Sequence, residues 1–313
     1  MFPKLPPGER SVYLFETLRE LGLNCQAIVP LKGDGSARKF FRIRTPRETF
    51  VLILPQPGEY GLREARAYYR LGRFLRAYGI PVPEILLYRD QDGLLLVEDL
   101  GDLRLCEHPA RDNLYPQAVK ILTKLQALTP YFPKESVLET LYYDRELIWH
   151  REILYFEKWY LKTYRKKPPC IETRSLLEEF LHESVKCFTD TVVLHRDFQS
   201  RNLMVKNDRL YVIDFQSTRL GPPSYDLASL VWDPYVARIP AERLLQLYLH
   251  LTSRDQEAFL REFKRISVFR LMQALGAFVK LSFEGKTWFR DYIPHAEERL
   301  RKLLPPPLKS LLE

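Results

Sequence analysis

The chain has 313 residues, of which 46% are hydrophobic and 28% are charged, and its formal net charge is +8. This composition is ordinary for a globular enzyme, and the length is sufficient for two lobes and a sizeable core. The sequence contains no run of 18 apolar residues, so we expect no segment that spans a membrane.

The cysteines and the charge pattern indicate where the protein works and what it binds. Cys25, Cys106, Cys170 and Cys187 are widely spaced and lack the pairing of a metal site, which is typical of reduced thiols in a cytoplasmic protein. The first nine residues lack the apolar core of a secretion signal. The basic clusters are short, and a positive balance attracts polyphosphates. Because no recognised nucleic-acid-binding motif is present, we expect no nucleic-acid partner; the oligomeric state stays open.

The first hundred residues predict a small antiparallel sheet. Apolar and β-branched runs predict strands at 27–31, 40–44, 49–54, 85–88 and 94–97, separated by segments with turn chemistry. Apolar residues from Ala65 to Tyr78 recur at helical spacing, and Gly79 with Pro81 ends this helix. The pattern therefore predicts five strands with one helix after the third.

The composition changes at residues 98–102, which we interpret as a hinge. We expect an N-terminal nucleotide-binding lobe at 1–100 and a C-terminal helical lobe, with the catalytic and acceptor-binding residues, at 101–313. Within the second lobe, residues 144–164 predict a long aromatic-rich helix with Leu147, Arg151, Leu154 and Lys158 on one face. This stretch is either a packing helix or a wall of the acceptor pocket.

The most informative motif lies between predicted strands at 191–194 and 203–206. Asp197 follows the first strand, Asn202 precedes the second, and a hairpin with a turn at 207–209 leads to Asp214. A strand, a loop and a tight hairpin bring Asn202 close to Asp214. Asp197 lies on the free loop, where it can face a substrate hydroxyl and accept its proton. Asn202 and Asp214 offer the hard oxygen ligands with which Mg²⁺ is held against the phosphates of ATP.

A purely structural interpretation of these three residues is also open. Asp197 could be a turn residue, Asn202 a cap at the start of a strand, and Asp214 a turn residue at the end of another. The fixed offsets and the strand that precedes Asp214 favour the catalytic interpretation.

The motif resembles that of the aminoglycoside phosphotransferase family, small-molecule relatives of the protein kinases. The resemblance implies an α+β, protein-kinase-like fold of two lobes, with a small antiparallel-sheet N-lobe and a larger, mostly helical C-lobe. It implies that His195 and Arg196 support the site. A second signature at 221–228 implies that Asp226 braces the catalytic loop; alone, Asp226 is also an ordinary carboxylate at a helix N-terminus. Adenine is implied to bind backbone groups near Glu98 and Leu100.

The phosphate-binding parts are less regular. Residues 33–36 could fold over the ATP phosphates, with Gly35, Ser36, Arg38 and Lys39 as contacts, although the same residues also suit a hairpin turn. Kinase-like enzymes carry a lysine on strand three that pairs with a helix glutamate. Here that strand has no lysine. Glu64 lies where the glutamate is expected, although it could equally be a solvated charge on the helix face. We expect Lys39 or Arg42 to substitute.

The acceptor is expected to be a small molecule. Only twelve positions separate Asp214 from Asp226, which leaves too little room for the peptide platform of a protein kinase. Over about residues 10–300 the chain resembles the anomeric N-acetylmuramate and N-acetylglucosamine kinases of cell-wall recycling, which implies an amino-sugar substrate. The alternatives are a kinase for another small alcohol or an aminoglycoside, and a nucleotide-binding protein without catalysis. In residues 144–164, acidic and basic side chains alternate, which does not favour a cationic acceptor.

Overall fold

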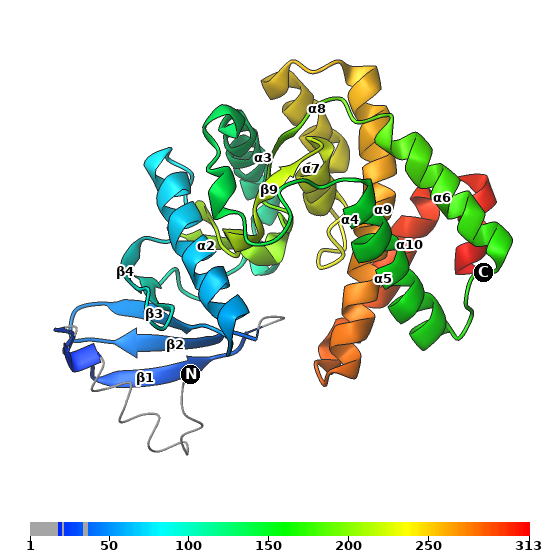
Figure 1. The fold of residues 1–313 in the computed structure, drawn as a ribbon. Helices are drawn as coiled ribbons and strands as arrows, with labels where there is room; N and C mark the ends of the chain where they lie inside the picture. Colours follow the sequence, from blue (N-terminus) through cyan, green and yellow to red (C-terminus); the bar gives the residue numbers. More distant parts are fainter. Residues whose placement is uncertain (1–17, 21, 34–36) are drawn as a thin grey trace.

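The computed structural model describes residues 18–20, 22–33 and 37–313, and it divides into a sheet-based N-terminal lobe and a helical C-terminal lobe (Figure 1). The strands of the first lobe pair antiparallel in the order β1-β2-β3-β5-β4. They are β1 (Ala27–Leu31), β2 (Lys39–Arg44), β3 (Thr49–Leu54), β4 (Ile85–Arg89) and β5 (Leu94–Glu98). Helix α2 (Glu59–Ala77) follows β3. The predicted fold class, including five strands with a helix after the third, is confirmed.

The two faces of the sheet belong to different clusters. Alternate residues of a strand point to opposite faces. One face and helix α2 join the main core of the protein, which continues into the second lobe. The other face packs a separate cluster that includes Ile43, Leu52 and Leu96. The position of a side chain in β2 therefore decides which way it points. Side chains on the same face as Phe40 point toward the second lobe, and those on the same face as Ile43 point away from it.

The second lobe is mostly helical. Its helices are α3 (Arg111–Ala127), α4 (Arg145–Ile148), α5 (Leu154–Phe156), α6 (Ile171–Val185), α7 (Ser224–Val231), α8 (Ala241–Thr252), α9 (Gln256–Phe283) and α10 (Ile293–Leu303). Two short antiparallel pairs interrupt them, β6 (Val192–Leu194) with β9 (Arg219–Gly221) and β7 (Leu203–Lys206) with β8 (Arg209–Val212). The strand, loop and hairpin expected around Asn202 are thus present.

Helix α9 is the central helix of this lobe. By length and composition alone it could cross a membrane, but 72% of its most apolar window is buried inside the protein. It packs against α7, α10 and the helical stretch that contains α5. Its apolar character is accounted for by these contacts.

The stretch from 144 to 164 differs from its prediction. It is helical, but π-helical turns at Trp149–Ile153 and Glu157–Arg165 widen the spacing of its buried side. Leu147 is buried and Leu154 is partly buried, whereas Arg151 and Lys158 are exposed. The prediction that these four residues share one face is wrong, because it assumed the period of a regular α-helix.

Helix α2 connects the lobes. The rings of Tyr68 on α2 and Phe215 lie with their centroids 4.5 Å apart. A Cβ atom at Gly72 would lie 3.0 Å from Phe215, so glycine allows the helix to approach this closely. Near the start of α2, Tyr60 donates to Glu139 (3.1 Å) and Arg63 to the Leu138 carbonyl (2.8 Å). The position of α2 is therefore fixed from the second lobe.

Candidate active site

The loop 195–202 leaves β6 in a conformation that its neighbours hold. Arg196 has φ 80°, a left-handed backbone that a side-chain-bearing residue adopts at a cost. Asp226, fully buried in the first turn of α7, accepts hydrogen bonds from the backbone N–H groups of His195 (2.6 Å) and Arg196 (2.8 Å). Burial raises the pKa of Asp226 to about 7, while these two donors act in the opposite direction.

His195 ties the loop to the end of β8. Its Nδ1 accepts from the Asp197 N–H (3.3 Å), which leaves Nε2–H to donate to the Ile213 carbonyl (2.9 Å). Burial lowers the pKa of His195, and the nearby carboxylates of Asp197 and Asp214 offset only part of that effect. The imidazole is therefore a neutral structural link at neutral pH.

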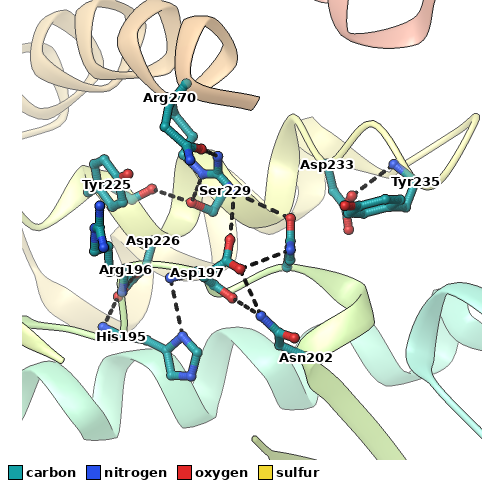
Figure 2. Close-up of polar contacts among 12 residues, drawn as sticks. His195, Arg196, Asp197, Asn202, Tyr225, Asp226, Ser229, Asp233, Tyr235 and Arg270 are labelled. Carbon is teal, nitrogen blue, oxygen red and sulfur yellow. Dashed lines mark hydrogen bonds and ion pairs between the residues drawn. The ribbon is translucent and has the colours of Figure 1, made fainter. Parts of the chain in front are cut away.

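Asp197 is the carboxylate at the centre of the loop (Figure 2). Asn202 Nδ2 donates to Asp197 Oδ2 (3.0 Å) and to its carbonyl (2.9 Å). Gln199 donates to the same Oδ2 (3.0 Å), and Arg270 Nη2 donates to Oδ1 (2.7 Å). The Asp197 side chain is still 40% exposed, so a substrate hydroxyl can reach it.

Asp214 follows Ile213 with φ 65° and faces the same cleft. Its Oδ1 accepts from Gln216 (3.0 Å) and from Arg38 in a short ion pair. Arg38 also lies 3.6 Å from Glu64 on α2. Burial alone would raise the pKa of Asp214, but Arg38 and Gln216 outweigh it and hold the pKa below its ordinary value. Asp214 is therefore ionised at neutral pH.

A cleft of about 660 Å³ joins these groups. One part is an apolar slot between the sheet and the second lobe, lined by Leu31, Phe40, Val51, Ile53, Val97, Met204 and Ile213. The other part is bounded by α9 and its neighbours through Ala274, Ala277, Phe278, Leu281, Tyr235 and Phe289. The slot suits a flat aromatic base, and Asp197, Asn202 and Asp214 lie along the same cleft.

Comparison with known proteins identifies this architecture. Residues 27–263 match the model of the phosphotransferase enzyme family, APH. The chain belongs to this family. It is 28% identical over 294 residues to the N-acetylmuramate/N-acetylglucosamine kinase of Pseudomonas aeruginosa, covering 85% of this chain and 80% of that protein. The kinase of the same name from Neisseria meningitidis is 27% identical over 291 residues, covering 86% and 83%.

Solved structures show the same fold at lower identity. The GDP complex of aminoglycoside 2'-phosphotransferase-IIIa aligns with a TM-score of 0.65 and 15% identity, over 94% of this chain and 99% of that one. Choline kinase LicA from Streptococcus pneumoniae aligns with a TM-score of 0.64 and 16% identity, over 94% and 99%. The protein is thus a small-molecule phosphotransferase of the APH family.

Arg38 has the position expected of a residue that replaces the missing lysine. Its guanidinium contacts both Glu64 and Asp214, as a strand-three lysine would be expected to contact the glutamate and the phosphates. The prediction that Lys39 or Arg42 substitutes is wrong. Lys39 is exposed and alternates to the sheet face opposite Arg38. Arg42 shares the face of Arg38 but binds Asp99 (2.6 Å) and Asp102 (2.9 Å) instead.

Of the other predicted nucleotide contacts, two lie in the cleft and two cannot be placed. Gly35 and Ser36 lie outside the described residues. Glu98 and Leu100 line the cleft. The Glu98 carboxylate accepts from Lys206 (2.8 Å), and its N–H donates to the Glu84 carbonyl (2.8 Å). The helical stretch 144–164 contributes no residue to the lining of the described cleft, which favours the interpretation as a packing helix over that as an acceptor wall.

The oxygen donors suit magnesium. The Asn202 amide commits its nitrogen to Asp197, so Oδ1 is the atom left for a cation, and Asp214 accepts its bonds on Oδ1 rather than Oδ2. Within the described part of the chain, no cluster of three or more His, Cys, Asp or Glu residues could hold a metal. Two hard oxygens without a full protein cage fit Mg²⁺, which takes its remaining ligands from phosphates and water.

Two residues of the site were missed by the sequence analysis. Arg270 lies 73 positions from Asp197, on an apolar helix, and no local pattern marks it. Asp233 is fully buried and accepts from the Ser200 N–H (2.7 Å), the Ser200 hydroxyl and the Tyr235 N–H (2.9 Å). It holds the turn that leads to Asn202. Both act across the fold rather than along the chain, which is why spacing did not reveal them.

Replacing Arg38 should weaken use of the nucleotide. In Arg38→Met, Glu64 and Asp214 lose their shared cation, so we expect kcat/KM for ATP to fall at least ~10-fold. Steady-state kinetics with varied ATP measures this. Arg44→Met, which replaces an exposed arginine at the end of β2, is the control and should stay close to wild type. Equal kinetics for the two variants would contradict the role of Arg38.

His195 should make stability depend on pH. Because its pKa is lowered in the folded state, the unfolded chain binds more protons below about pH 6.5. Its contribution is complete above that pH and is lost as the pH falls through the folded-state pKa. Glutamine can donate to the Ile213 carbonyl but does not titrate. Urea unfolding should therefore show that His195→Gln loses less stability than wild type between about pH 7.5 and 5.5, by at most about 1.4 kcal/mol per pH unit. Parallel pH profiles would refute this.

Proposed function

We propose that this protein uses ATP and Mg²⁺ to phosphorylate the anomeric hydroxyl of an N-acetylated amino sugar, such as N-acetylmuramate or N-acetylglucosamine, giving the sugar 1-phosphate for cell-wall recycling. The single observation that carries the reaction type is the meeting of Asp197, Asn202 and Asp214 along one cleft. The choice of sugar is supported by the similarity to the N-acetylmuramate/N-acetylglucosamine kinases, which extends over most of both chains.

Asp197 is proposed to bind the acceptor. Its exposed carboxylate orients the anomeric hydroxyl by a hydrogen bond and accepts its proton as the oxygen bonds to phosphorus. That hydroxyl is more acidic than an ordinary alcohol because the ring oxygen withdraws electrons, so a carboxylate is a sufficient base. Held by three donors, Asp197 is fixed before the substrate arrives. Positioning is therefore a large part of the expected rate enhancement.

The remaining groups meet the phosphates. Asn202 and Asp214 would hold Mg²⁺, which when bound neutralises charge on the transferring phosphoryl group. Arg38 adds a fixed positive charge beside Asp214. The apolar slot between Phe40 and Met204 would take the base of the nucleotide. In this arrangement the nucleotide lies against the sheet, and the sugar lies on the α9 side of Asp197.

Charge pairing favours a neutral or anionic acceptor over a polycation. Each carboxylate of the described cleft lining has a cationic partner: Glu64 and Asp214 pair with Arg38, Glu98 with Lys206, Asp99 and Asp102 with Arg42, and Asp197 with Arg270. Apart from Arg270 and Gln273, the residues with which α9 lines the cleft are apolar. An aminoglycoside, which carries several ammonium groups, would need carboxylates that are not already paired. A pyranose ring can place its apolar face on such a wall.

The experiment is an acceptor panel. Purified protein with ATP and Mg²⁺ is given N-acetylmuramate, N-acetylglucosamine, unacetylated sugars, small alcohols such as choline, and an aminoglycoside, and ADP release is measured. We expect acceptor-dependent turnover with the N-acetylated sugars, and NMR should show phosphate on C1. Turnover only with choline or only with an aminoglycoside would show that this compound, and not the amino sugar, is the substrate class. Nucleotide binding without turnover on any acceptor would favour a non-catalytic protein.

Asp197 can be tested separately. Asp197→Asn keeps the size of the side chain but removes the base, so we expect kcat to fall at least ~100-fold while ATP binding stays largely intact. Turnover and calorimetric ATP affinity are measured on the same preparation. A variant that turns over at near wild-type rate would rule out the proposed role.

A further inference from the structure

Arg270 forms an ion pair with the proposed base, Asp197, and it comes from a distant part of the chain. It lies in the middle of α9, its side chain is only 7% exposed, and it lines the cleft. Nη2 donates to Asp197 Oδ1 at 2.7 Å and to Gln199 Oε1 at 3.3 Å. A buried guanidinium is costly unless it is paired, so Arg270 and Asp197 depend on each other.

Two further side chains hold the guanidinium in place. Its Nε donates to the Ser229 hydroxyl oxygen at 2.8 Å, and Nη1 donates to Gln273 Oε1 through a short hydrogen bond. Ser229 in turn donates to the Tyr225 carbonyl on its own helix. Figure 2 shows the resulting chain of contacts from α7 through Arg270 to the loop. The fork of Arg270 is thus oriented independently of Asp197.

The contacts divide the two carboxylate oxygens of Asp197. Oδ1 accepts from Arg270, whereas Oδ2 accepts from Gln199 and Asn202. With one oxygen held from the α9 side and the other from the loop, the carboxylate has little freedom to rotate. Removal of Arg270 would leave Oδ1 without this donor and would allow that rotation.

We propose that Arg270 is a positioning residue, which fixes the rotation of the Asp197 carboxylate so that the acceptor hydroxyl meets it in one orientation. The proposal rests on the role of Asp197 in the proposed function. Displacement of a catalytic group by about 1 Å can cost ~100-fold in rate, so the expected effect is on kcat. A lysine cannot replace it, since one ammonium lacks the planar fork that reaches Ser229, Gln273 and Asp197 together.

The test is a double-mutant cycle. Arg270→Lys and Arg270→Met are made in the wild-type and Asp197→Asn backgrounds, and kcat and KM for ATP are measured. Alone, each Arg270 variant should lower kcat about 10–100-fold and leave KM for ATP within about 3-fold. In the Asp197→Asn background, the same changes should cost less than about 3-fold, because the group they position is already lost. Arg261→Met, an exposed arginine on the same helix, is the matched control and should match wild type.

Loss of folding is separated from loss of positioning by a second pair of variants. Ser229→Ala and Gln273→Met keep the charge of Arg270 but each removes one contact that holds it. They should lower kcat about 3–10-fold without changing KM for ATP, and this loss should also disappear in the Asp197→Asn background. Wild-type kcat in the Arg270 variants, or equal losses in both backgrounds, would overturn the proposal.

The outcome is distinguishable from failure of the proposed sugar substrate. If no acceptor of the panel supports turnover by the wild-type protein, the cycle is measured on hydrolysis of ATP to ADP and phosphate, in which water supplies the attacking oxygen and Asp197 takes its proton. The same non-additivity between Arg270 and Asp197 is expected there. If the losses of hydrolysis rate in the Arg270 and Asp197 variants were additive, the positioning role would be refuted, whereas the choice of sugar would not be affected.

Discussion

The site depends on two buried carboxylates that hold the backbone of the loop 195–202. Asp226 binds the N–H groups of His195 and Arg196 at the start of the loop, and Asp233 binds Ser200 near its end. The left-handed backbone at Arg196 is stable only while the first pair of bonds persists. Because both carboxylates lie on or just after α7, a single helix sets the shape of the loop and hence the place of Asp197.

A second set of ionic contacts relates the lobes to each other. Arg38, directly before β2, joins the first lobe to Asp214 of the second, and Glu64 connects α2 to the same contact. Lys206 of the second lobe binds Glu98 and the Asp99 carbonyl in the connecting segment. Residues of both lobes therefore line the slot, and ion pairs of Arg38 and of Lys206 connect the two sides. Arg38 therefore links the position of Asp214 to that of the first lobe.

The sequence predicted what depends on local patterns. Alternation and turn chemistry were enough for the strands of the first lobe, and the spacing of Asp197, Asn202 and Asp214 was enough to expect their meeting. The prediction failed for Lys39 because the register of β2 turns this side chain to the face opposite the cleft. It failed for Arg42 because Asp99 and Asp102, far away in the sequence, bind this guanidinium. It missed Arg270 and Asp233, whose partners are 73 and 33 positions away, respectively. Contacts of this range are created by helix packing, which no short motif encodes.

In the proposed function, the central helix α9 contacts both the base and the acceptor. Arg270, Ala274, Ala277, Phe278 and Leu281 recur at helical spacing and line the same cleft, so one face of α9 carries both the partner of Asp197 and the apolar wall. On another side, a Cβ atom at Gly276 would lie 2.6 Å from the ring of Tyr155 in α5, so glycine lets α9 pack closely against the helical stretch 144–164. That stretch therefore contributes to the cleft indirectly, by fixing the helix that lines it. A substitution at this contact would shift the wall and Arg270 together, and for this reason acceptor affinity and turnover are expected to change in concert along α9.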